Sequence, residues 1–435
     1  MPHTLSIVGL GPGDPSLRSI AAQKALNDAS RIILRTGIHP GIEDQIGDRR
    51  VVTCDDLYEA LPTFKALYPA IVERVLGYLN QGDCVYAVPG NPVAGELTVI
   101  QLRSAAVAAG HAVVVIPGAG GLDVIAAATG LDLMADGVQT LDALDLREWT
   151  ERAPFNGGLL DINPLRPLIV TQVYKRSVAS AVKLALGNAY PDEHQISVIG
   201  WDGAANITAA QLIPLHELDR VRVDHLTSIV VPPVEWQRNT RSPFELFRIT
   251  SRLRDEGGCP WDREQTHASI RAKVVEEAYE VVDAIDTGSA ADLAEELGDL
   301  LLQAALHAQI ADEAGEFTIA DVFEAVSGKL IRRHPHVFGD AVAENAHAVI
   351  KTWEAVKSTE PGKQDRPKRD PYRKLPRAMP VQQKIALVEG SDGSTLTETE
   401  AGQLARDVSA GLLRFARAGI DPNDLLDAAY RIIRG

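Results

Sequence analysis

The segment Leu5-Ser-Ile-Val-Gly-Leu-Gly-Pro-Gly-Asp-Pro-Ser-Leu17 joins a short apolar run to a glycine-rich turn and the start of a helical stretch. Similar units recur up to about residue 232. The apolar runs that predict strands are 5–8, 85–88, 112–116, 168–170 and 196–199. The helical stretches between them are 16–29, 67–80, 95–109 and 178–188. Strands that alternate with helices predict an α/β fold with a largely parallel sheet, in which ligands bind at the carboxyl ends of the strands.

Length and charge limit the classes of protein to consider. The chain has 435 residues, with 43 Lys and Arg against 59 Asp and Glu, so its formal net charge is −16. This length predicts two or three domains. A hydrophobic content of 45% excludes global disorder. The acidic balance argues against binding to duplex nucleic acid, which needs a basic surface to neutralise phosphates.

Cysteine usage and hydropathy predict a cytoplasmic protein without a membrane partner. Cys54, Cys84 and Cys259 show no CxxC spacing, so neither a zinc ribbon nor a disulfide framework is expected. The first ten residues lack a basic segment followed by an apolar one, as a signal peptide would have. No apolar run approaches the roughly 18–20 residues that span a bilayer.

The composition of the chain changes beyond Pro232. We expect an α/β domain over 1–232 and an all-α domain over 242–360, where long helical periodicities replace strands. Residues 361–377 hold seven Lys or Arg and four Pro, which predicts an exposed linker. A helical tail over 378–435 follows.

Two acidic segments, Val275-Glu-Glu-Ala-Tyr-Glu280 and Glu295-Glu-Leu-Gly-Asp299, are the most specific feature of the helical domain. Residues three apart share one helix face, so Glu277 pairs with Glu280 and Glu296 with Asp299. Gly288 and Ser289 mark a break that makes the two helices antiparallel neighbours. Crowded carboxylates raise each other's pKa unless a cation intervenes, and oxygen ligands favour Mg²⁺, with Mn²⁺ as an alternative. The other interpretation is a solvated acidic helix face.

Basic and aromatic residues follow this acidic cluster. Lys329 and Arg333 lie four apart, as do Trp353 and Lys357, so each pair shares a helix face. Cations suit phosphates, and an indole ring suits a base. Together with a metal, these groups predict binding of a nucleoside polyphosphate.

The acidic segments resemble the metal motif of the MazG nucleoside triphosphate pyrophosphohydrolases. Gly258-Cys-Pro-Trp-Asp-Arg-Glu-Gln-Thr-His267 and the KLIRRHPHVF segment that begins at Lys329 are also similar to that family. The resemblance implies a helical, dimeric enzyme that splits a nucleoside triphosphate into a monophosphate and diphosphate with Mg²⁺. It implies metal ligands at Glu277, Glu280, Glu296 and Asp299, and catalytic roles for Glu276, Glu277 and Glu280. The implied nucleotide contacts are Trp261, Lys329, Arg332, Arg333, Trp353 and Lys357.

The first half resembles the tetrapyrrole (corrin/porphyrin) methylase superfamily. The motifs are GLGPGDPSL from Gly9, Tyr86-Ala-Val-Pro-Gly-Asn-Pro92 and Val115-Ile-Pro-Gly-Ala-Gly-Gly121. A more specific similarity is to the YabN-type fusion of such a domain with MazG, carried by Leu34-Arg-Thr36, His39-Pro40, Asp142-Ala-Leu-Asp-Leu146 and Asp224-His-Leu-Thr-Ser228. The resemblance implies two α/β halves and an S-adenosylmethionine site at Gly9, Gly11, Gly13, Asp14, Gly90, Asn91, Pro92, Pro117 and Gly118.

Three functions remain open at this stage. The first is pyrophosphohydrolysis, with one metal site per chain, because residues 375–435 resemble an eroded second MazG copy without the acidic motif. The second makes methyl transfer the main activity, with a helical assembly domain. The third is a nucleotide sensor without turnover. The methylase-like domain itself is expected either to transfer methyl groups or to serve ligand sensing and assembly.

Overall fold

The computed structural model describes residues 2–42, 50–61, 63–201, 207–343 and 345–359. The chain divides into two compact units, Met1–Ile310 and Ala311–Gly435, which are described separately. The predicted linker, 361–377, and the predicted tail, 378–435, lie outside the described residues. The domain boundaries inferred from composition stay predictions.

The first sheet is entirely parallel, with strand order β3-β2-β4-β1-β5. Its strands are β1 (Thr4–Gly9), β2 (Ile32–Leu34), β3 (Val51–Thr53), β4 (Cys84–Val88) and β5 (Ala112–Ile116). Strand β1, which lies between β4 and β5, pairs Leu5 with Cys84 on one side and with Val113 on the other. The three strands predicted here, 5–8, 85–88 and 112–116, are confirmed, and β2 and β3 are additions of three residues each.

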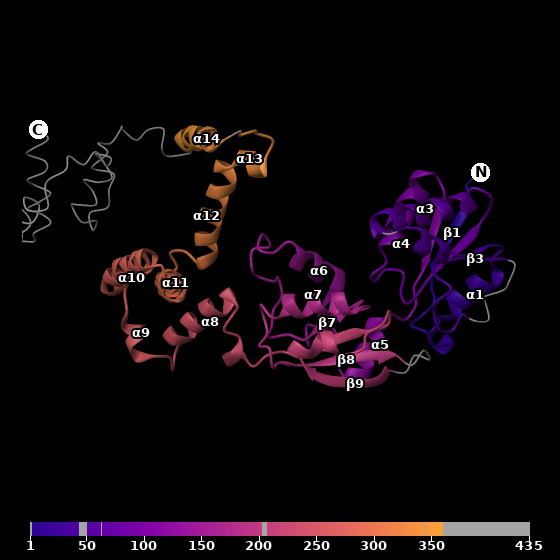
Figure 1. Ribbon diagram of the computed structural model, residues 1–435, viewed down its shortest axis with the longest axis horizontal. Coiled ribbons are helices and arrows are strands. Elements are labelled where there is room, and N and C mark those ends of the chain that lie inside the picture. The colour runs from indigo at the N-terminus through magenta and orange to yellow at the C-terminus, as the bar shows by residue number, and fades with distance from the viewer. Residues whose placement is uncertain (1, 43–49, 62, 202–206, 344, 360–435) are drawn as a thin grey trace, which may run out of the picture. The chain divides into compact units, whose positions relative to one another are not determined.

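Helices cover both faces of this sheet (Figure 1). Because side chains alternate along a strand, Leu5 and Ile7 of β1 pack with α3 and α4, whereas Val8 packs with α1. The helices are α1 (Ile20–Asp28), α2 (Asp55–Ala60), α3 (Phe64–Leu79) and α4 (Leu97–Ala108). The next helix, α5 (Gly121–Thr129), packs against the second sheet through Ile125. The predicted helix 16–29 begins late, because a short 3-10 turn η1 (Pro15–Leu17) comes first and Ser19 caps α1.

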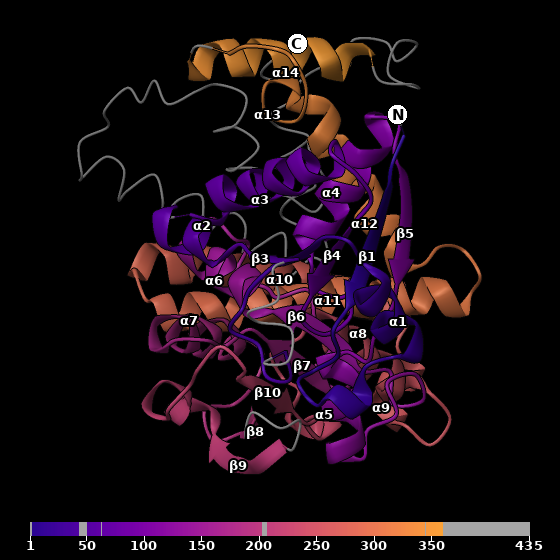
Figure 2. The same cartoon turned by 90° about the vertical axis from the view of Figure 1, so that its right-hand side faces the viewer.

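The second sheet corrects the expectation of a largely parallel fold. Its order is β6-β7-β10-β8-β9, which Figure 2 shows, and only β6 and β7 are parallel. The strands are β6 (Gln139–Asp142), β7 (Leu168–Thr171), β8 (Gln195–Trp201), β9 (Ile207–Pro214) and β10 (Ser228–Val231). Strands β8 and β9 pair directly as antiparallel neighbours, which the prediction missed.

A separate core supports the second sheet. Val178, Val182 and Leu186 of α7 (Arg176–Leu186) are fully buried against β7, β8 and β10. The other elements of this half are α6 (Ala143–Glu151) and the 3-10 turns η2 (Leu215–Arg220) and η3 (Trp236–Arg238). The two α/β halves expected from the methylase resemblance are therefore present.

From Pro243 to Thr359 the described residues form helices and no strand, as predicted. The first unit contains α8 (Pro243–Arg254), α9 (Pro260–Glu264), α10 (His267–Thr287) and most of α11 (Ala290–Glu313). The second contains α12 (Ile319–Arg333), α13 (Pro335–Phe338) and α14 (Ala346–Thr359). Within the described part of the chain, no helix combines the length and apolar character needed to cross a bilayer.

Candidate metal centre

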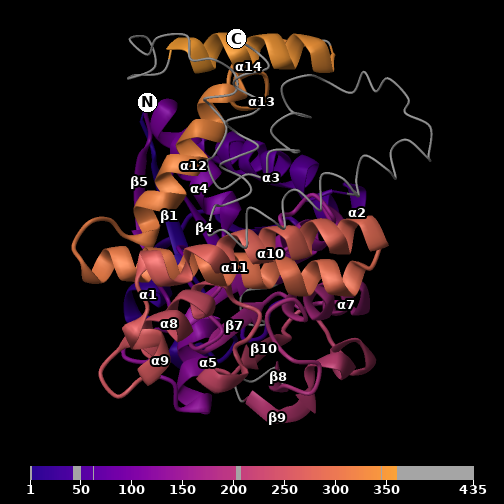
Figure 3. The same cartoon turned by 90° about the vertical axis from the view of Figure 1, so that its left-hand side faces the viewer.

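The helices α10 and α11 lie side by side as an antiparallel pair (Figure 3). The Thr266 hydroxyl accepts a hydrogen bond from the Ser269 amide, and this cap begins α10. Gly288 ends the helix in a left-handed conformation, with φ of 74°. The break at Gly288 and Ser289 is thus confirmed, and it is short enough to return the chain directly into α11.

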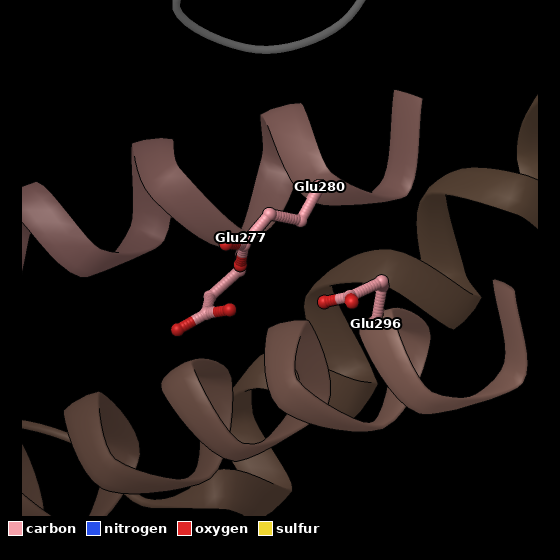
Figure 4. Close-up of side chains that lie close together, drawn as sticks. All are labelled: Glu277, Glu280 and Glu296. Atoms are coloured by element: carbon pink, nitrogen blue, oxygen red, sulfur yellow. The ribbon is translucent and has the colours of Figure 1, made fainter. Parts of the chain in front are cut away.

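Three carboxylates from these two helices converge (Figure 4). Glu277 and Glu280 come from α10 and Glu296 from α11, and one oxygen of each lies within 4.8 Å of the others. Glu277 and Glu296 are partly buried, whereas Glu280 is exposed. The helical spacing inferred from sequence therefore does bring three of the four predicted metal ligands together. We call Glu277, Glu280 and Glu296 the acidic cluster.

The carboxylates of the acidic cluster perturb one another. Desolvation raises the pKa of Glu277, and the nearby Glu280 and Asp299 raise it further. Desolvation also raises the pKa of Glu296, with further contributions from Glu280 and Asp299. The fourth predicted ligand, Asp299, is therefore close enough to act on both groups, although it is not among the three that converge. A divalent cation would relieve this repulsion.

Two neighbours of the acidic cluster were missed by the sequence analysis. The buried Gln303 donates from Nε2 to Oε1 of Glu277 over 3.4 Å, and Oε1 of Gln303 has no hydrogen-bond partner among the described residues. Lys273 forms a 2.7 Å ion pair with Glu276, and the carboxylates around it raise the pKa of this lysine. Gln303 could have been found, because it lies four residues beyond Asp299 and therefore shares its helix face. Glu276, a predicted catalytic residue, points to Lys273.

The donor set fits a hard divalent cation. Carboxylate oxygens without sulfur or imidazole are typical ligands of Mg²⁺ and Mn²⁺. Gln303 orients one carboxylate by hydrogen bonding, as residues behind metal ligands commonly do. Of the four predicted ligands, Glu277, Glu280 and Glu296 would hold the ion, whereas Asp299 acts on Glu277 and Glu296 through its charge.

The predicted nucleotide contacts fall in different places. Trp261 of α9 is 60% exposed. In the second unit, the guanidinium of Arg333, a residue only 8% exposed, stacks over the Trp353 ring at 5.0 Å. Lys329 is partly buried and Arg332 exposed on α12, and Lys357 lies in the last turn of α14. The structure therefore joins Arg333 to Trp353 as one cation–π pair.

The three glycine motifs of the first half meet at one point. A Cβ on Gly9 would lie 2.6 Å from the carbonyl oxygen of Gly90 and 2.8 Å from the amide nitrogen of Gly118. The ring of Pro92 is equally close. Gly11 and Gly90 also exchange two backbone hydrogen bonds. These glycines, which the resemblance assigned to cofactor binding, allow three strand ends to touch.

The remaining predicted cofactor residues have local partners. Asp14 accepts a hydrogen bond from the Ser16 amide, which lowers its pKa, and caps η1. Asn91 accepts from the Val93 amide, and the carbonyl of Pro117 accepts from the Ser19 hydroxyl. Gly13 adopts a φ of 142° in the same turn. Pro92 is the one residue of this set that also lines the large cavity of this half.

Comparison with known proteins identifies the same two parts of the chain, an α/β part and a helical part. Residues 4–209 match the family described as Tetrapyrrole (Corrin/Porphyrin) Methylases. Residues 265–338, which include the acidic cluster, match the MazG nucleotide pyrophosphohydrolase domain. Fold and site thus define a methylase-like α/β domain joined to a MazG-type helical domain.

Relatives match this chain over different lengths. YabN of Bacillus subtilis (strain 168) is 35% identical over 395 residues, which cover 89% of this chain and 77% of YabN. The nucleoside triphosphate pyrophosphohydrolase of Escherichia coli (strain K12) is 48% identical over 201 residues, or 43% of this chain and 76% of that protein. The nucleoside triphosphate pyrophosphohydrolase/pyrophosphatase MazG of Thermotoga maritima is 50% identical over 119 residues, or 27% of this chain and 45% of that protein. The chain therefore belongs to the YabN family of tetrapyrrole methylase–MazG fusions.

Proposed function

We propose that the helical part hydrolyses nucleoside triphosphates to nucleoside monophosphates and diphosphate, with Mg²⁺ held by the acidic cluster and Asp299. The observation that carries this proposal is the convergence of Glu277, Glu280 and Glu296 within 4.8 Å. The similarity to the nucleoside triphosphate pyrophosphohydrolases of Escherichia coli and Thermotoga maritima supports the reaction class.

Each group of the chain has a defined task in this reaction. Bound Mg²⁺ would neutralise phosphate charge and acidify a water molecule. The carboxylates of the acidic cluster hold the ion, and one carboxylate among Glu276, Glu277 and Glu280 receives the proton of the attacking water. Gln303 keeps Glu277 oriented through its hydrogen bond. Lys329, Arg332, Arg333 and Lys357 supply cations for the phosphate chain, and Trp261 and Trp353 are the rings available for a base.

A panel of nucleoside triphosphates tests the proposal. Incubation with Mg²⁺ should release diphosphate and the matching monophosphate in equal amounts. Release of orthophosphate, or binding of nucleotide without turnover, would contradict pyrophosphohydrolysis and favour the sensor alternative. Comparing kcat/KM over standard and modified bases identifies the preferred substrate.

Proton competition should make the Mg²⁺ requirement depend on pH. The pKa values of Glu277 and Glu296 are raised, so both carboxyls take up protons at a higher pH than an ordinary Glu does. Ligands must be deprotonated to bind a metal. The Mg²⁺ concentration for half-maximal activity should therefore rise as the pH falls from about 8 to about 5. A constant value across that range would show that these carboxyls do not hold the ion.

The Arg333–Trp353 pair provides a second test. Arg333→Ala should raise KM for the triphosphate about tenfold or more and change kcat less, because it removes a phosphate-binding cation and the partner of the ring. Arg248→Ala, at an exposed residue of α8 that has no role in the proposed site, is the matched control for general charge. Equal KM effects in both variants would contradict a specific role for Arg333.

We infer that the helical part forms a homodimer. Large apolar side chains remain exposed on its helices in the single chain, including Val282 at 48% and Leu301 at 58%. Exposed apolar surface of this kind marks sites of association. Sedimentation velocity should give a dimer, and Leu301→Glu should shift it toward the monomer, whereas a monomeric native protein would refute the inference.

We further infer that the methylase-like half binds S-adenosylmethionine. The meeting point of Gly9, Gly90 and Gly118 lies at the carboxyl ends of β1, β4 and β5, where α/β folds bind ligands. Calorimetry with S-adenosylmethionine and S-adenosylhomocysteine tests this cofactor. If neither compound produced binding heat or a thermal shift, the methylase-like domain would not bind the cofactor and would serve sensing or assembly instead.

A further inference from the structure

The methylase-like half contains a cavity of about 850 Å³, which is within the range of organic-ligand sites. Both α/β halves contribute to its wall. Phe64 and Tyr68 come from α3 and Arg103 from α4, whereas Asp142 and Asp145 come from the start of α6. The cavity is therefore bounded by two independent cores rather than by one flexible loop.

The charged groups of this wall are mainly acidic. Glu96, Asp142 and Asp145 line the cavity, and Arg103 is the cation among its lining residues. Glu96 already forms an ion pair with Arg35, which does not line the cavity. This leaves two acidic side chains, Asp142 and Asp145, and one basic side chain, Arg103, in the cavity wall. Burial, together with the charge of Asp145, raises the pKa of Asp142.

Asp142 is held in a fixed orientation. One of its oxygens accepts from the Leu144 amide at 2.8 Å and so caps α6, and the other accepts from Nε2 of Gln172, also at 2.8 Å. Gln172 has a φ of 63°, a left-handed conformation that residues other than glycine rarely adopt. Such strained residues cluster at ligand sites, where the surrounding structure maintains them. The amide of Gln172 thus positions a carboxylate in the cavity wall.

Another part of the wall is aromatic and apolar. The rings of Phe64 and Tyr68 lie 5.4 Å apart with an interplanar angle of 31°. Ile100 and Val107, which also line the cavity, are 64% and 59% exposed. Aromatic faces attract cations, and exposed apolar side chains favour an apolar ligand body.

We propose that this cavity binds an organic cation, an apolar or aromatic molecule that carries a protonated amine, as a ligand separate from S-adenosylmethionine. The ammonium group lies between Asp142 and Asp145, and the apolar body lies against Phe64 and Tyr68. A polycarboxylate macrocycle would instead bring further negative charge to Asp142 and Asp145. Two motif segments of the fusion subtype, at Arg35 and at Asp142–Leu146, flank this site. The proposal is independent of the pyrophosphohydrolase activity and does not require methyl transfer.

Two probes that share an indole ring but carry opposite charges test the ligand class. Tryptamine and indole-3-acetate are titrated into the full-length protein, and binding is followed by ligand-observed NMR and calorimetry. Tryptamine should bind at least about tenfold more tightly than indole-3-acetate. Equal affinity, tighter binding of the acid, or binding of neither probe would overturn the proposal.

Asp145→Asn locates the bound amine. This variant should weaken tryptamine binding about tenfold, because it removes the negative charge and keeps the side-chain shape. Glu148→Gln is the matched control, since Glu148 is exposed on the same helix and does not line the cavity. Unchanged affinity in Asp145→Asn, or an equal loss in both variants, would place the amine elsewhere and refute the site.

Competition separates this ligand from the cofactor. Tryptamine affinity is measured in the presence and absence of saturating S-adenosylhomocysteine. Unchanged or increased affinity supports a separate ligand site. Mutual exclusion of the two compounds would show that the cavity belongs to the cofactor and would overturn the proposal, while leaving the S-adenosylmethionine inference intact.

Discussion

Glu277→Gln is expected to abolish diphosphate release, with a loss in kcat/KM of about 100-fold or more. Glu277 is the carboxylate of the acidic cluster that Gln303 orients, and Glu280 and Asp299 raise its pKa. Replacing it with a neutral amide removes a charged metal ligand at the point where the proposed Mg²⁺ stabilises transition-state charge, which is worth several kcal/mol. The measurement is diphosphate release as a function of Mg²⁺ concentration.

The fold should survive this substitution. A raised pKa means that the folded protein disfavours the ionised Glu277, so a neutral residue of the same shape should leave thermal stability equal or higher in the absence of metal. Asp286→Asn, on an exposed residue near the end of α10, serves as the matched control and should keep full activity. Normal turnover by Glu277→Gln would refute the assignment of the acidic cluster as the metal site.

Gly9→Ala is expected to destabilise the methylase-like half by about 3 kcal/mol or to prevent its folding. The added Cβ would lie 2.6 Å from the Gly90 carbonyl oxygen and 2.8 Å from the Gly118 amide nitrogen. Both neighbours are backbone atoms, so no side chain can rotate away to relieve the contact. Urea unfolding followed by circular dichroism measures the effect.

Gly82→Ala is the control for this substitution. Gly82 follows α3, and a Cβ there would meet no atom within 4 Å. The stability of the Gly82→Ala variant should match that of the native protein or slightly exceed it, because alanine lowers the conformational entropy of the unfolded chain. If both alanine variants unfold at the same urea concentration, then the contact among the three glycine motifs is not a constraint on the fold.

Most elements of the first sheet and the acidic helix pair could be predicted from local sequence. Runs such as 5–8 and 85–88 are continuous apolar segments, which is typical of strands buried on both faces. Spacing by three residues placed Glu277 and Glu280 on one helix face without any tertiary information. Short strands such as β2 and β3, with three residues each, were missed because so few residues carry no periodicity.

The sequence alone established an α/β part, a helical part and a set of carboxylates at helical spacing. It could do so because periodicity and turn residues are local properties. The tertiary structure decided what residues far apart in the chain do together. It paired β8 with β9 and made the second sheet mainly antiparallel. It also brought Gln303 to Glu277, and Gln172 to Asp142 across 30 residues. Such contacts depend on how elements pack, and no local pattern records the packing partner of a polar side chain.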